Sequence, residues 1–374
     1  MLLGRYGMID FEKLFGNIYK NKTVLVTGHT GFKGSWLSFW LKQMGVNVIG
    51  YSLEAPTTPN HIGLLDLDIV SIIGDIRDLE KLNGIMNKYK PDVVFHLAAQ
   101  PLVRLSYENP IETYETNVIG TLKVLEACKN NNVKAIVNIT SDKAYENKEW
   151  VWGYRENDPL GGYDPYSSSK GCADILVNSY RNSFFNLAEY SKTHNTLLAS
   201  CRAGNVIGGG DWAKDRLMTD IMVSVSKGKK VKIRNPQATR PWQHVLEPLS
   251  GYLHIGQKLL EGKKEFAEAW NFGPSDEGSI TVEEVVKKVK KYWSKIDYEI
   301  NQEKNQLHEA NLLKLDCSKA HIKLKWKNVW DSETTFEKTV KWYKKFYENN
   351  KILTEKNLND YIKDAKNKNI EWVR

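Results

Sequence analysis

The first 140 residues alternate between short apolar runs and longer amphipathic stretches, and this alternation constrains the fold more than any other feature. The apolar runs are rich in β-branched residues, which is typical of strands buried on both faces. Strands are predicted at 23–28, 46–53, 71–76, 92–99 and 135–141, and helices at about 34–45, 78–89, 101–109 and 113–131. Such alternation, with right-handed crossovers, predicts an α/β fold with a doubly wound parallel sheet.

Beyond about residue 198 the alternation loosens, and the chain becomes more polar. An apolar run at 197–208 is predicted to form a strand leading into a loop, and amphipathic stretches at 279–293 and 334–350 are predicted helices. The last two dozen residues are rich in lysine and asparagine, so we expect an exposed helical appendage. The predicted parts are a first domain over 1–198, to which some later segments return, a smaller interleaved domain over 199–345, and an appendage over 346–374.

Composition excludes several classes of protein. With 41% hydrophobic and 26% charged residues, the chain is typical of a globular protein, and no apolar run approaches the ~18 residues that cross a bilayer. The net charge of +8 comes from lysines scattered among acidic residues, so we expect neither a nucleic-acid nor a membrane partner. The cysteines lie far apart and lack CxxC spacing, which predicts reduced thiols, a cytoplasmic location and no metal site. They are Cys128, Cys172, Cys201 and Cys317.

A glycine-rich turn stands between the first predicted strand and the first predicted helix. In "VTGHTGFKGSWL" the glycines are Gly28, Gly31 and Gly34. A pyrophosphate can approach the backbone of such a turn only where no Cβ intrudes, and the following helix offers unpaired N–H groups. A glycine triplet alone could be no more than a tight turn. Between a strand and a helix, it predicts a dinucleotide-binding Rossmann domain.

The stretch "YDPYSSSKG" places a tyrosine and a lysine four residues apart. Asp164 is a predicted N-cap and Pro165 a predicted first helical residue, so Tyr166 and Lys170 share one face of a helix. A phenol with an ordinary pKa of roughly 10 is a poor base at neutral pH, and a nearby ammonium together with the positive charge of an oxidised nicotinamide would lower that pKa. This spacing is common by chance in helices. Following a glycine turn, it predicts a Tyr–Lys proton-transfer pair.

Ser141, Asp142 and Lys143 end the strand that precedes this helix, at the sheet edge where ligands bind in such folds. A serine there can hydrogen-bond a reacting oxygen, and the carboxyl and amine add an acid–base pair, which is equipment for eliminating water. The alternative is a surface salt bridge at the end of a strand.

The spacing GxxGxxG, rather than GxGxxG, resembles the extended short-chain dehydrogenase/reductase superfamily. The resemblance implies NAD as cofactor, although Ser52 stands where an acid usually holds the ribose, with Glu54 two residues later. No arginine beside Ser52 could receive a 2′-phosphate, which favours NAD over NADP. The implied cofactor-binding residues are Gly28, Thr30, Gly31, Phe32, Gly34, Asp75, Ile76, Leu97, Ala98, Ala99, Asn117, Tyr166 and Lys170.

A narrower resemblance covers roughly residues 20–345. The segments "GHTGFKGSWL", "FHLAAQPLVR", "TSDKAYENKEW", "RAGNVIGGGDWAKDRL" and "RPWQHVLEPLSGYL" are similar to the CDP-glucose 4,6-dehydratase family. This family carries Asp-Lys at Asp142–Lys143, whereas dTDP-glucose dehydratases carry Asp-Glu there. Ala144 departs from the cysteine expected next. The family implies that Asn205, Arg216 and Arg240 contact the substrate diphosphate, and that Trp242 lies beneath the site unless it is a core residue.

The resemblance implies a hydro-lyase that turns CDP-glucose into CDP-4-keto-6-deoxyglucose, an early step in deoxysugar biosynthesis for O-antigen or other polysaccharides. Tyr166 would take the C4 hydroxyl proton as NAD accepts hydride, Lys143 would take the C5 proton, and Asp142 would protonate the departing C6 hydroxyl. The alternatives are another nucleotide-sugar 4,6-dehydratase, a nucleotide-sugar epimerase or reductase, and a non-catalytic NAD sensor. We expect a homodimer or homotetramer that pairs through helices near 113–131 and 168–185.

Overall fold

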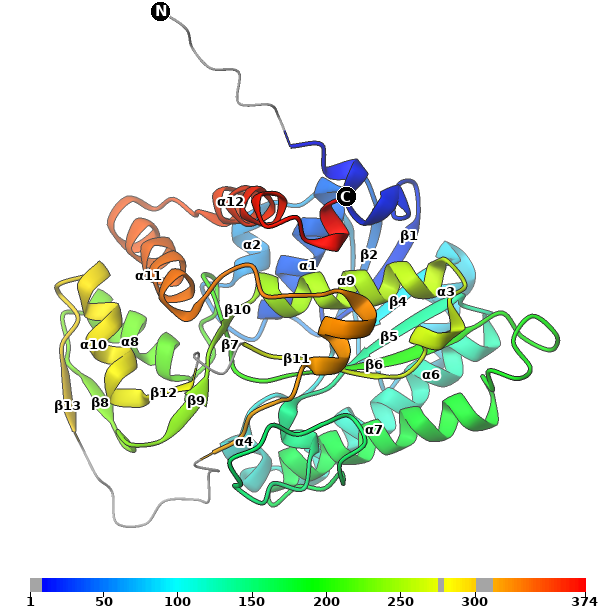
Figure 1. Cartoon of the computed structure of the whole chain (residues 1–374), viewed down its shortest axis with the longest axis horizontal. Helices are drawn as coiled ribbons and strands as arrows, with labels where there is room; N and C mark the ends of the chain where they lie inside the picture. Colours follow the sequence, from blue (N-terminus) through cyan, green and yellow to red (C-terminus); the bar gives the residue numbers. More distant parts are fainter. Residues whose placement is uncertain (1–8, 275–278, 301–311) are drawn as a thin grey trace, which may run out of the picture.

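A seven-stranded parallel sheet lies at the centre of the computed structural model, which describes residues 9–274, 279–300 and 312–374 (Figure 1). The strand order is β11-β6-β5-β4-β1-β2-β3, and every neighbouring pair is parallel. The order reverses beside β1, which is where a doubly wound sheet opens a crevice for a ligand. The strands are β1 (Thr23–Thr27), β2 (Asn47–Ser52), β3 (Val70–Ile73), β4 (Val93–His96), β5 (Ala135–Ile139), β6 (Leu197–Ala203) and β11 (Ala269–Phe272).

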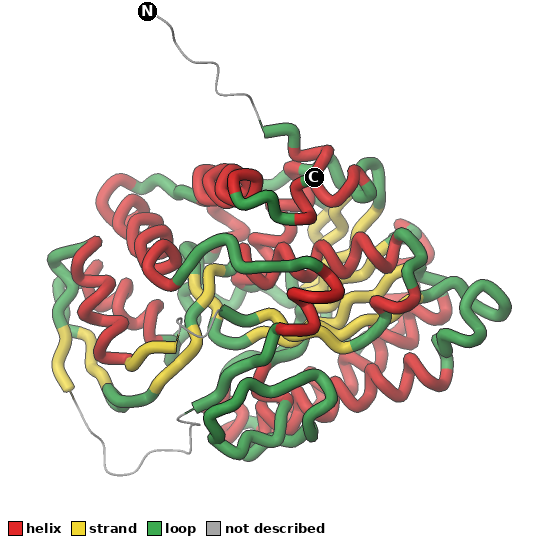
Figure 2. Tube along the Cα trace, in the orientation of Figure 1, coloured by secondary structure: helices red, strands yellow, loops and turns green. Residues whose placement is uncertain are grey.

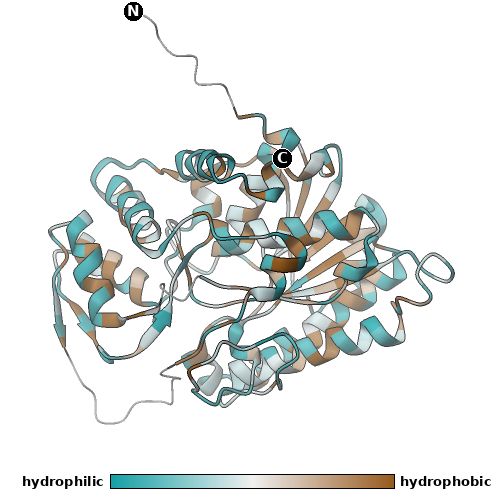
Figure 3. Ribbon diagram, viewed as in Figure 1, coloured by the Kyte–Doolittle hydropathy of each residue, from teal (hydrophilic) through white to brown (hydrophobic). Residues whose placement is uncertain are grey.

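Helices cover both faces of this sheet, which confirms the predicted doubly wound α/β fold. Along β1, Val24 and Val26 point into one apolar cluster and Leu25 into the other, because successive strand residues face opposite sides. The first face packs against α1 (Phe32–Gln43) and α9 (Leu246–Leu260). The second face packs against α3 (Leu79–Tyr89), α6 (Thr121–Asn130) and α7 (Pro165–Ser183). Figure 3 shows the apolar colouring concentrated on the strands between these layers.

A smaller cluster of helices and short strands stands beside the carboxyl edge of the sheet (Figure 2). It has its own apolar core, which includes Trp212, Trp242 and Trp342. Its elements are α8 (Leu217–Ser226), β8 (Val231–Ile233), β9 (Thr239–Pro241), β12 (Ser279–Thr281), α10 (Val282–Tyr292), β13 (Tyr298–Ile300) and α11 (Ser332–Asn349). Two short strands, β7 (Val206–Ile207) and β10 (Gln243–His244), pair between this part and the main sheet. The predicted domain limits at 198 and 345 stay a prediction.

Several predicted elements differ in length from the observed ones. The predicted strand at 92–99 ends at His96, and the predicted strand at 197–208 divides into β6 and β7, because these chain ends leave the sheet to form loops at its carboxyl edge. The helix predicted at 101–109 is α4 (Val103–Glu108). The helix predicted at 113–131 begins earlier, with α5 (Pro110–Tyr114), and passes through a π-helical turn over Glu115–Gly120 before α6.

The expectation of an exposed C-terminal appendage is wrong. The segment is helical, in α12 (Thr354–Asn367), but Leu358, Tyr361, Ile362 and Ala365 are buried in the same apolar cluster as α1 and α9. These residues recur at helical spacing and form one apolar face. The lysines of this helix are exposed on the other face, which Figure 3 shows as largely hydrophilic, whereas Asn357 is buried.

All four cysteines are free thiols, and three of them, Cys128, Cys201 and Cys317, are buried. Within the described ranges, no helix is both long and apolar enough to span a membrane.

Candidate active site

The glycine turn after β1 closes only because its residues lack side chains. Gly28 adopts a φ of +77°, and a Cβ there would lie 2.7 Å from the backbone nitrogen of Ala98. A Cβ on Gly34 would lie 2.1 Å from the carbonyl oxygen of Gly28. Both distances are far shorter than any real contact, so the turn and the first turn of α1 can approach each other only with glycine.

Gly31 differs from the other two glycines, because a Cβ there would meet nothing closer than the Gly28 oxygen at 3.4 Å. It is the N-cap of α1, and no side chain caps this helix, so the N–H groups of the first turn are not satisfied by a capping side chain. Gly31 leaves space in front of this helix N-terminus, and the unpaired N–H groups there can bind a pyrophosphate. The residues present therefore fit a dinucleotide.

Thr30 and Ser52 connect this turn to the end of β2. The Thr30 hydroxyl lies 2.8 Å from the Ser52 hydroxyl and donates to the carbonyl oxygen of Leu53 at 2.9 Å. The predicted ribose position therefore carries a buried pair of hydroxyls in place of the usual carboxylate.

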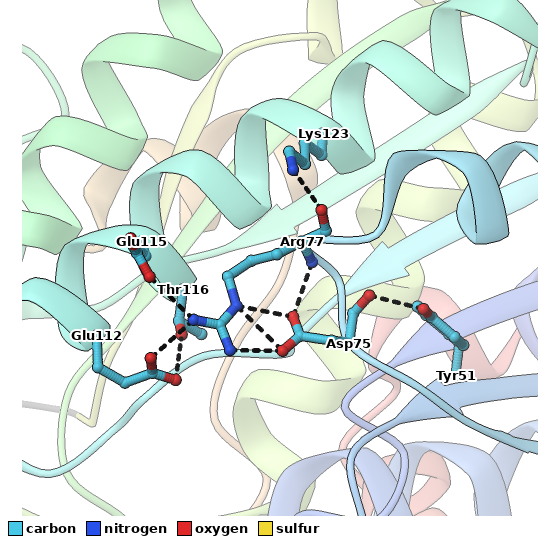
Figure 4. A network of polar contacts seen from close by, with 7 residues as sticks. All are labelled: Tyr51, Asp75, Arg77, Glu112, Glu115, Thr116 and Lys123. Carbon is cyan, nitrogen blue, oxygen red and sulfur yellow. Dashed lines mark hydrogen bonds and ion pairs between the residues drawn. The ribbon is translucent and has the colours of Figure 1, made fainter.

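Asp75 lies at the centre of a polar network beyond the end of β3 (Figure 4). Its carboxylate accepts from Arg77 Nε at 3.0 Å and from Arg77 Nη2 at 2.6 Å. Arg77 also contacts Glu112 at 2.7 Å and Glu115 at 3.1 Å, on the helices that lead into α6. Arg77 lowers the pKa of the Asp75 carboxyl, which therefore stays ionised as an acceptor. The neighbouring Ile76 packs its side chain into the apolar cluster on the second face of the sheet.

Asn117 braces the loop that follows β4. Its side-chain oxygen accepts from the Gln100 nitrogen at 2.8 Å, and its amide donates to the Gln100 carbonyl at 3.1 Å and to the Ser169 hydroxyl at 2.8 Å. Asn117 thus connects Gln100, which directly follows Leu97–Ala99, to helix α7. Direct contact of Asn117 with a cofactor stays a prediction.

Ser141 begins a short 3₁₀ turn over Asp142–Ala144 at the end of β5. The Ser141 hydroxyl donates to Asp142 Oδ1 at 2.9 Å and accepts from the Lys143 nitrogen at 3.3 Å. Asp142 is 5% exposed, and this burial raises its carboxyl pKa although the charge of Lys143 acts in the opposite direction. Lys143 itself is partly exposed.

Tyr166 and Lys170 lie in the first turns of α7, as predicted from the sequence. Asp164 caps this helix by accepting from the Ser167 nitrogen at 2.9 Å. In the protein alone, burial raises the pKa of Tyr166 to about 12, against an opposing hydrogen bond with Ser141. Burial also lowers the pKa of Lys170 to about 8. Desolvation therefore dominates both groups here. The lowered phenol pKa, which depends also on the charge of an oxidised nicotinamide, stays a prediction.

The predicted substrate residues converge on the same edge of the sheet. One pocket is lined by Asp142, Lys143, Asn205, Arg240 and Leu313. Four of these five residues were predicted from the sequence to serve the reaction or the substrate, although they come from segments up to about a hundred residues apart.

Arg216 completes this set from the start of α8. It contacts Asp211 at 2.6 Å, and its positive charge acts on Tyr166, where it favours the phenolate. Trp242 is 6% exposed and packs against Phe336 in the core of the smaller part, so the structure gives it the core position that was the alternative expectation.

Sequence reasoning missed Lys33, in the first turn of α1. Burial, Arg216 and Lys170 lower its pKa to about 8, and Asp142 acts in the opposite direction. Lys33 therefore belongs to the same electrostatic cluster as the predicted residues. The sequence "TGFKG" contained a signal for Lys33. A lysine in the first turn of a helix is electrostatically unfavourable, because the helix dipole is positive there, so its presence indicates a functional role.

Comparison with known proteins identifies the family of this chain. The sequence profile of the GDP-mannose 4,6-dehydratase family matches residues 25–341. The chain belongs to this family. It is 55% identical, over 351 residues, to CDP-glucose 4,6-dehydratase of Salmonella typhimurium, covering 92% of this chain and 98% of that protein. This similarity confirms the resemblance predicted from the sequence. A dTDP-glucose 4,6-dehydratase of the same organism is 27% identical, over 72% of this chain and 77% of its own length.

Solved structures share the fold of this dehydratase family member. An epimerase of Methanothermobacter thermautotrophicus gives a TM-score of 0.78 at 24% identity, over 94% of this chain and 99% of its own. A UDP-glucose 4-epimerase of Brucella ovis, solved with NAD, gives 0.72 at 20% identity, over 85% and 97%. At these identities the likeness establishes the fold alone.

Proposed function

We propose that the protein is an NAD-dependent hydro-lyase that converts CDP-glucose into CDP-4-keto-6-deoxyglucose. The dehydratase of Salmonella typhimurium supports the substrate, because the similarity extends over almost all of both chains. The observation that carries the reaction type is the buried Asp142 next to Lys143, in the pocket that Asn205 and Arg240 also line. An epimerase or a simple reductase needs no such acid–base pair.

NAD, when bound, supplies hydride acceptance from C4 of the sugar and hydride return to C6. The glycine turn at Gly28, Gly31 and Gly34 would hold its pyrophosphate, with Thr30 and Phe32 in the same turn. Asp75 and Ile76 would hold the adenine, and Leu97, Ala98 and Ala99 would line the nicotinamide side, with Asn117 behind them.

Tyr166 accepts the proton of the C4 hydroxyl at its phenol oxygen. Because burial raises the pKa of Tyr166 to about 12 in the protein alone, positive charge must act on it when the substrate reacts. Arg216 already favours the phenolate, and Lys170 one turn along α7 adds to it when protonated. Ser141 is placed to hydrogen-bond the same sugar oxygen.

Lys143 and Asp142 carry out the elimination. Once C4 is a ketone, the C5 hydrogen is acidic, and Lys143 removes it at Nζ. Asp142 gives its proton to the C6 hydroxyl as water leaves. As hydride returns to C6, the protonated Lys143 gives a proton back to C5. The raised pKa of Asp142 suits this role, because a carboxyl must be protonated to act as a general acid.

The substrate diphosphate is held by Asn205, Arg216 and Arg240. Arginine can bind phosphate oxygens in a bidentate manner, and an amide can donate to one more. Lys33 adds positive charge to the same region. The excess of cations over carboxylates around Asp142 suits an anionic ligand.

We also propose that the chain forms a homodimer or homotetramer through α5, the π-helical turn, α6 and α7. Ile111, Ile119 and Ile175 on these helices are 74%, 42% and 56% exposed, although they are large and apolar. A partner subunit would cover them. The free thiols fit the cytoplasm, where an activated deoxysugar for polysaccharide assembly would be made.

The proposal is tested by incubating the purified enzyme and NAD with CDP-glucose, dTDP-glucose, GDP-mannose and UDP-glucose in parallel. We expect alkaline detection of a 4-keto product, formed most efficiently from CDP-glucose. An epimerised sugar without loss of water would identify an epimerase instead. A preference for another nucleotide would leave the reaction intact and overturn the assigned substrate.

A further inference from the structure

One buried ion pair connects the strand next to the catalytic turn with the catalytic helix. Arg202, in β6, donates from Nε to Oδ2 of Asp174, in α7, at 3.0 Å. The two side chains are only 4% and 1% exposed. Neither residue belongs to the set assigned to substrate, cofactor or proton transfer. A buried pair of charges is costly to desolvate, so its presence needs a reason beyond stability.

The pair contacts both ends of the turn that carries Ser141, Asp142 and Lys143. At one end, the Thr140 hydroxyl donates to Asp174 Oδ2 at 2.7 Å. At the other end, Arg202 Nη1 donates to the Tyr145 hydroxyl at 2.7 Å, and its guanidinium lies 4.7 Å from the centre of the Tyr145 ring. Thr140 and Tyr145, immediately before and after Ser141–Ala144, thus both form hydrogen bonds with the same ion pair.

The same network continues into the loop that follows the turn. The Tyr145 hydroxyl donates to Asn271 Oδ1 at 2.8 Å, and the Asn271 amide donates to the Tyr154 carbonyl at 2.8 Å. Arg202 Nη1 also donates to the Glu156 carbonyl at 3.1 Å. The network therefore joins the turn and the loop after it to strands β6 and β11 and to helix α7. The turn can therefore move relative to α7 only if the network breaks.

We propose that Arg202 and Asp174 are positioning residues that hold the elimination pair, Asp142 and Lys143, in register with the oxidation pair, Tyr166 and Lys170. The inference rests on the proposed function, because register between two pairs matters only if both act on one sugar. Misplacing reacting groups by about 1 Å can cost roughly a hundredfold in rate. Ser141 connects the two pairs directly, because it contacts both Asp142 and Tyr166, and the ion pair holds the residues on either side of the turn that carries it.

Asp174 has a second effect, on the charge of Lys170 one turn earlier in α7. Burial lowers the pKa of Lys170 to about 8, and Asp174 acts in the opposite direction. The other groups around Lys170 are Lys33 of α1, whose positive charge opposes that of Lys170, and His96 of β4, which burial keeps neutral with a pKa of about 3. Arg202 partly neutralises Asp174, so the two members of the pair influence Lys170 in opposite directions.

The test compares Asp174→Asn and Arg202→Met in the full-length enzyme with NAD. We expect kcat to fall by about ten- to a hundredfold in both, with KM for CDP-glucose within about twofold of wild type. The alkaline limit of kcat/KM should move to lower pH in Asp174→Asn, because Lys170 loses its proton more readily.

Tyr180→Phe is the matched control. It removes a hydrogen bond of 2.9 Å to Glu126 from the same helix, away from the turn, and should leave both kcat and the pH profile unchanged. If Asp174→Asn or Arg202→Met fails to fold, Thr140→Val and Tyr145→Phe each remove one connection while keeping the ion pair, and each should lower kcat several-fold without raising KM.

Two results would overturn the inference: variants that lose thermal stability but keep wild-type kcat, or an alkaline limit in Asp174→Asn that does not move to lower pH. Failure of the proposed function would show differently, as a wild-type enzyme that forms no 4-keto product from CDP-glucose.

Discussion

Two carboxyls in different parts of the molecule have raised pKa values because both are buried. Their surroundings differ. Asp142, at the carboxyl edge of the sheet, is held by Ser141 and lines a pocket with Lys143. Glu247, in α9, is 0% exposed, and burial raises its pKa to about 7. In both cases removal from water penalises the charged form.

The protein itself supplies the hydrogen-bond donors to the Glu247 carboxyl, whereas the Asp142 carboxyl lines a pocket. Glu247 accepts from the Val329 nitrogen at 3.0 Å, from the Trp330 nitrogen at 2.8 Å and from the Tyr361 hydroxyl at 3.0 Å. Through these hydrogen bonds the C-terminal segment is held against helix α9. A buried acid whose oxygens are already taken by the protein is structural, and one that faces a pocket with a second titratable group beside it is a candidate for chemistry.

Among the variants of the candidate active site, Tyr166→Phe should lower turnover the most. Removing the phenol oxygen leaves no acceptor for the C4 hydroxyl proton, so we expect turnover to fall by at least about a hundredfold. The thermal midpoint should change little, since the ring stays buried. Product assays and thermal unfolding of the same preparation measure both. Near-normal turnover would remove Tyr166 from the reaction.

Lys143→Met and Asp142→Asn should separate the two halves of the elimination. We expect Lys143→Met to oxidise C4, seen as absorbance of bound reduced cofactor, but to exchange the C5 hydrogen with solvent deuterium about a hundredfold more slowly than wild type. Asp142→Asn should still exchange at C5 and expel water slowly. Wild-type exchange in Lys143→Met would transfer the base role to another residue, with Glu146 the next candidate.

Arg216→Ala and Arg240→Ala should raise KM for CDP-glucose. Each loses a charge-assisted contact of about 1.5–3 kcal/mol, equivalent to roughly ten- to a hundredfold. NAD affinity, measured by fluorescence titration, should stay near its wild-type value, and Arg374→Ala on the surface serves as the control. If KM is unchanged in both variants, the diphosphate binds elsewhere.

Glu247→Gln should affect stability and leave catalysis nearly unchanged. Because the folded protein raises the pKa of Glu247 from 4.5 to about 7, ionisation costs stability as the pH rises through this range. The variant cannot ionise, so its stability relative to wild type should increase between pH 5 and pH 8, by at most about 3 kcal/mol. Denaturant unfolding at several pH values measures this, and a difference independent of pH would contradict the account.

The sequence predicted the first part of the fold because local signals agree there. Short apolar strands and a Pro165-initiated helix each depend on neighbouring residues alone, and the glycine turn is recognised from its spacing between a strand and a helix. Asp142 and Lys143 were predicted from their place at the end of a strand, whereas Asn205 and Arg240 were implied by the family resemblance, and all four line one pocket.

Other features could not be predicted in this way. The pairing of Arg202 with Asp174 joins residues 28 positions apart through tertiary packing, which no local pattern records. The C-terminal helix was misjudged because composition was used in place of periodicity, although Leu358, Tyr361 and Ile362 recur at helical spacing. The burial that raises the pKa of Tyr166 in the protein alone also could not be obtained from spacing.

The most direct test of the central claim is a reaction of the wild-type enzyme with CDP-glucose and NAD in deuterium oxide, followed by mass spectrometry of the product. A 4,6-dehydratase that removes and replaces the C5 hydrogen should give a nucleotide sugar that has lost one water and carries one solvent deuterium at C5. A product of unchanged mass apart from exchangeable positions, with an inverted C4, would contradict the account.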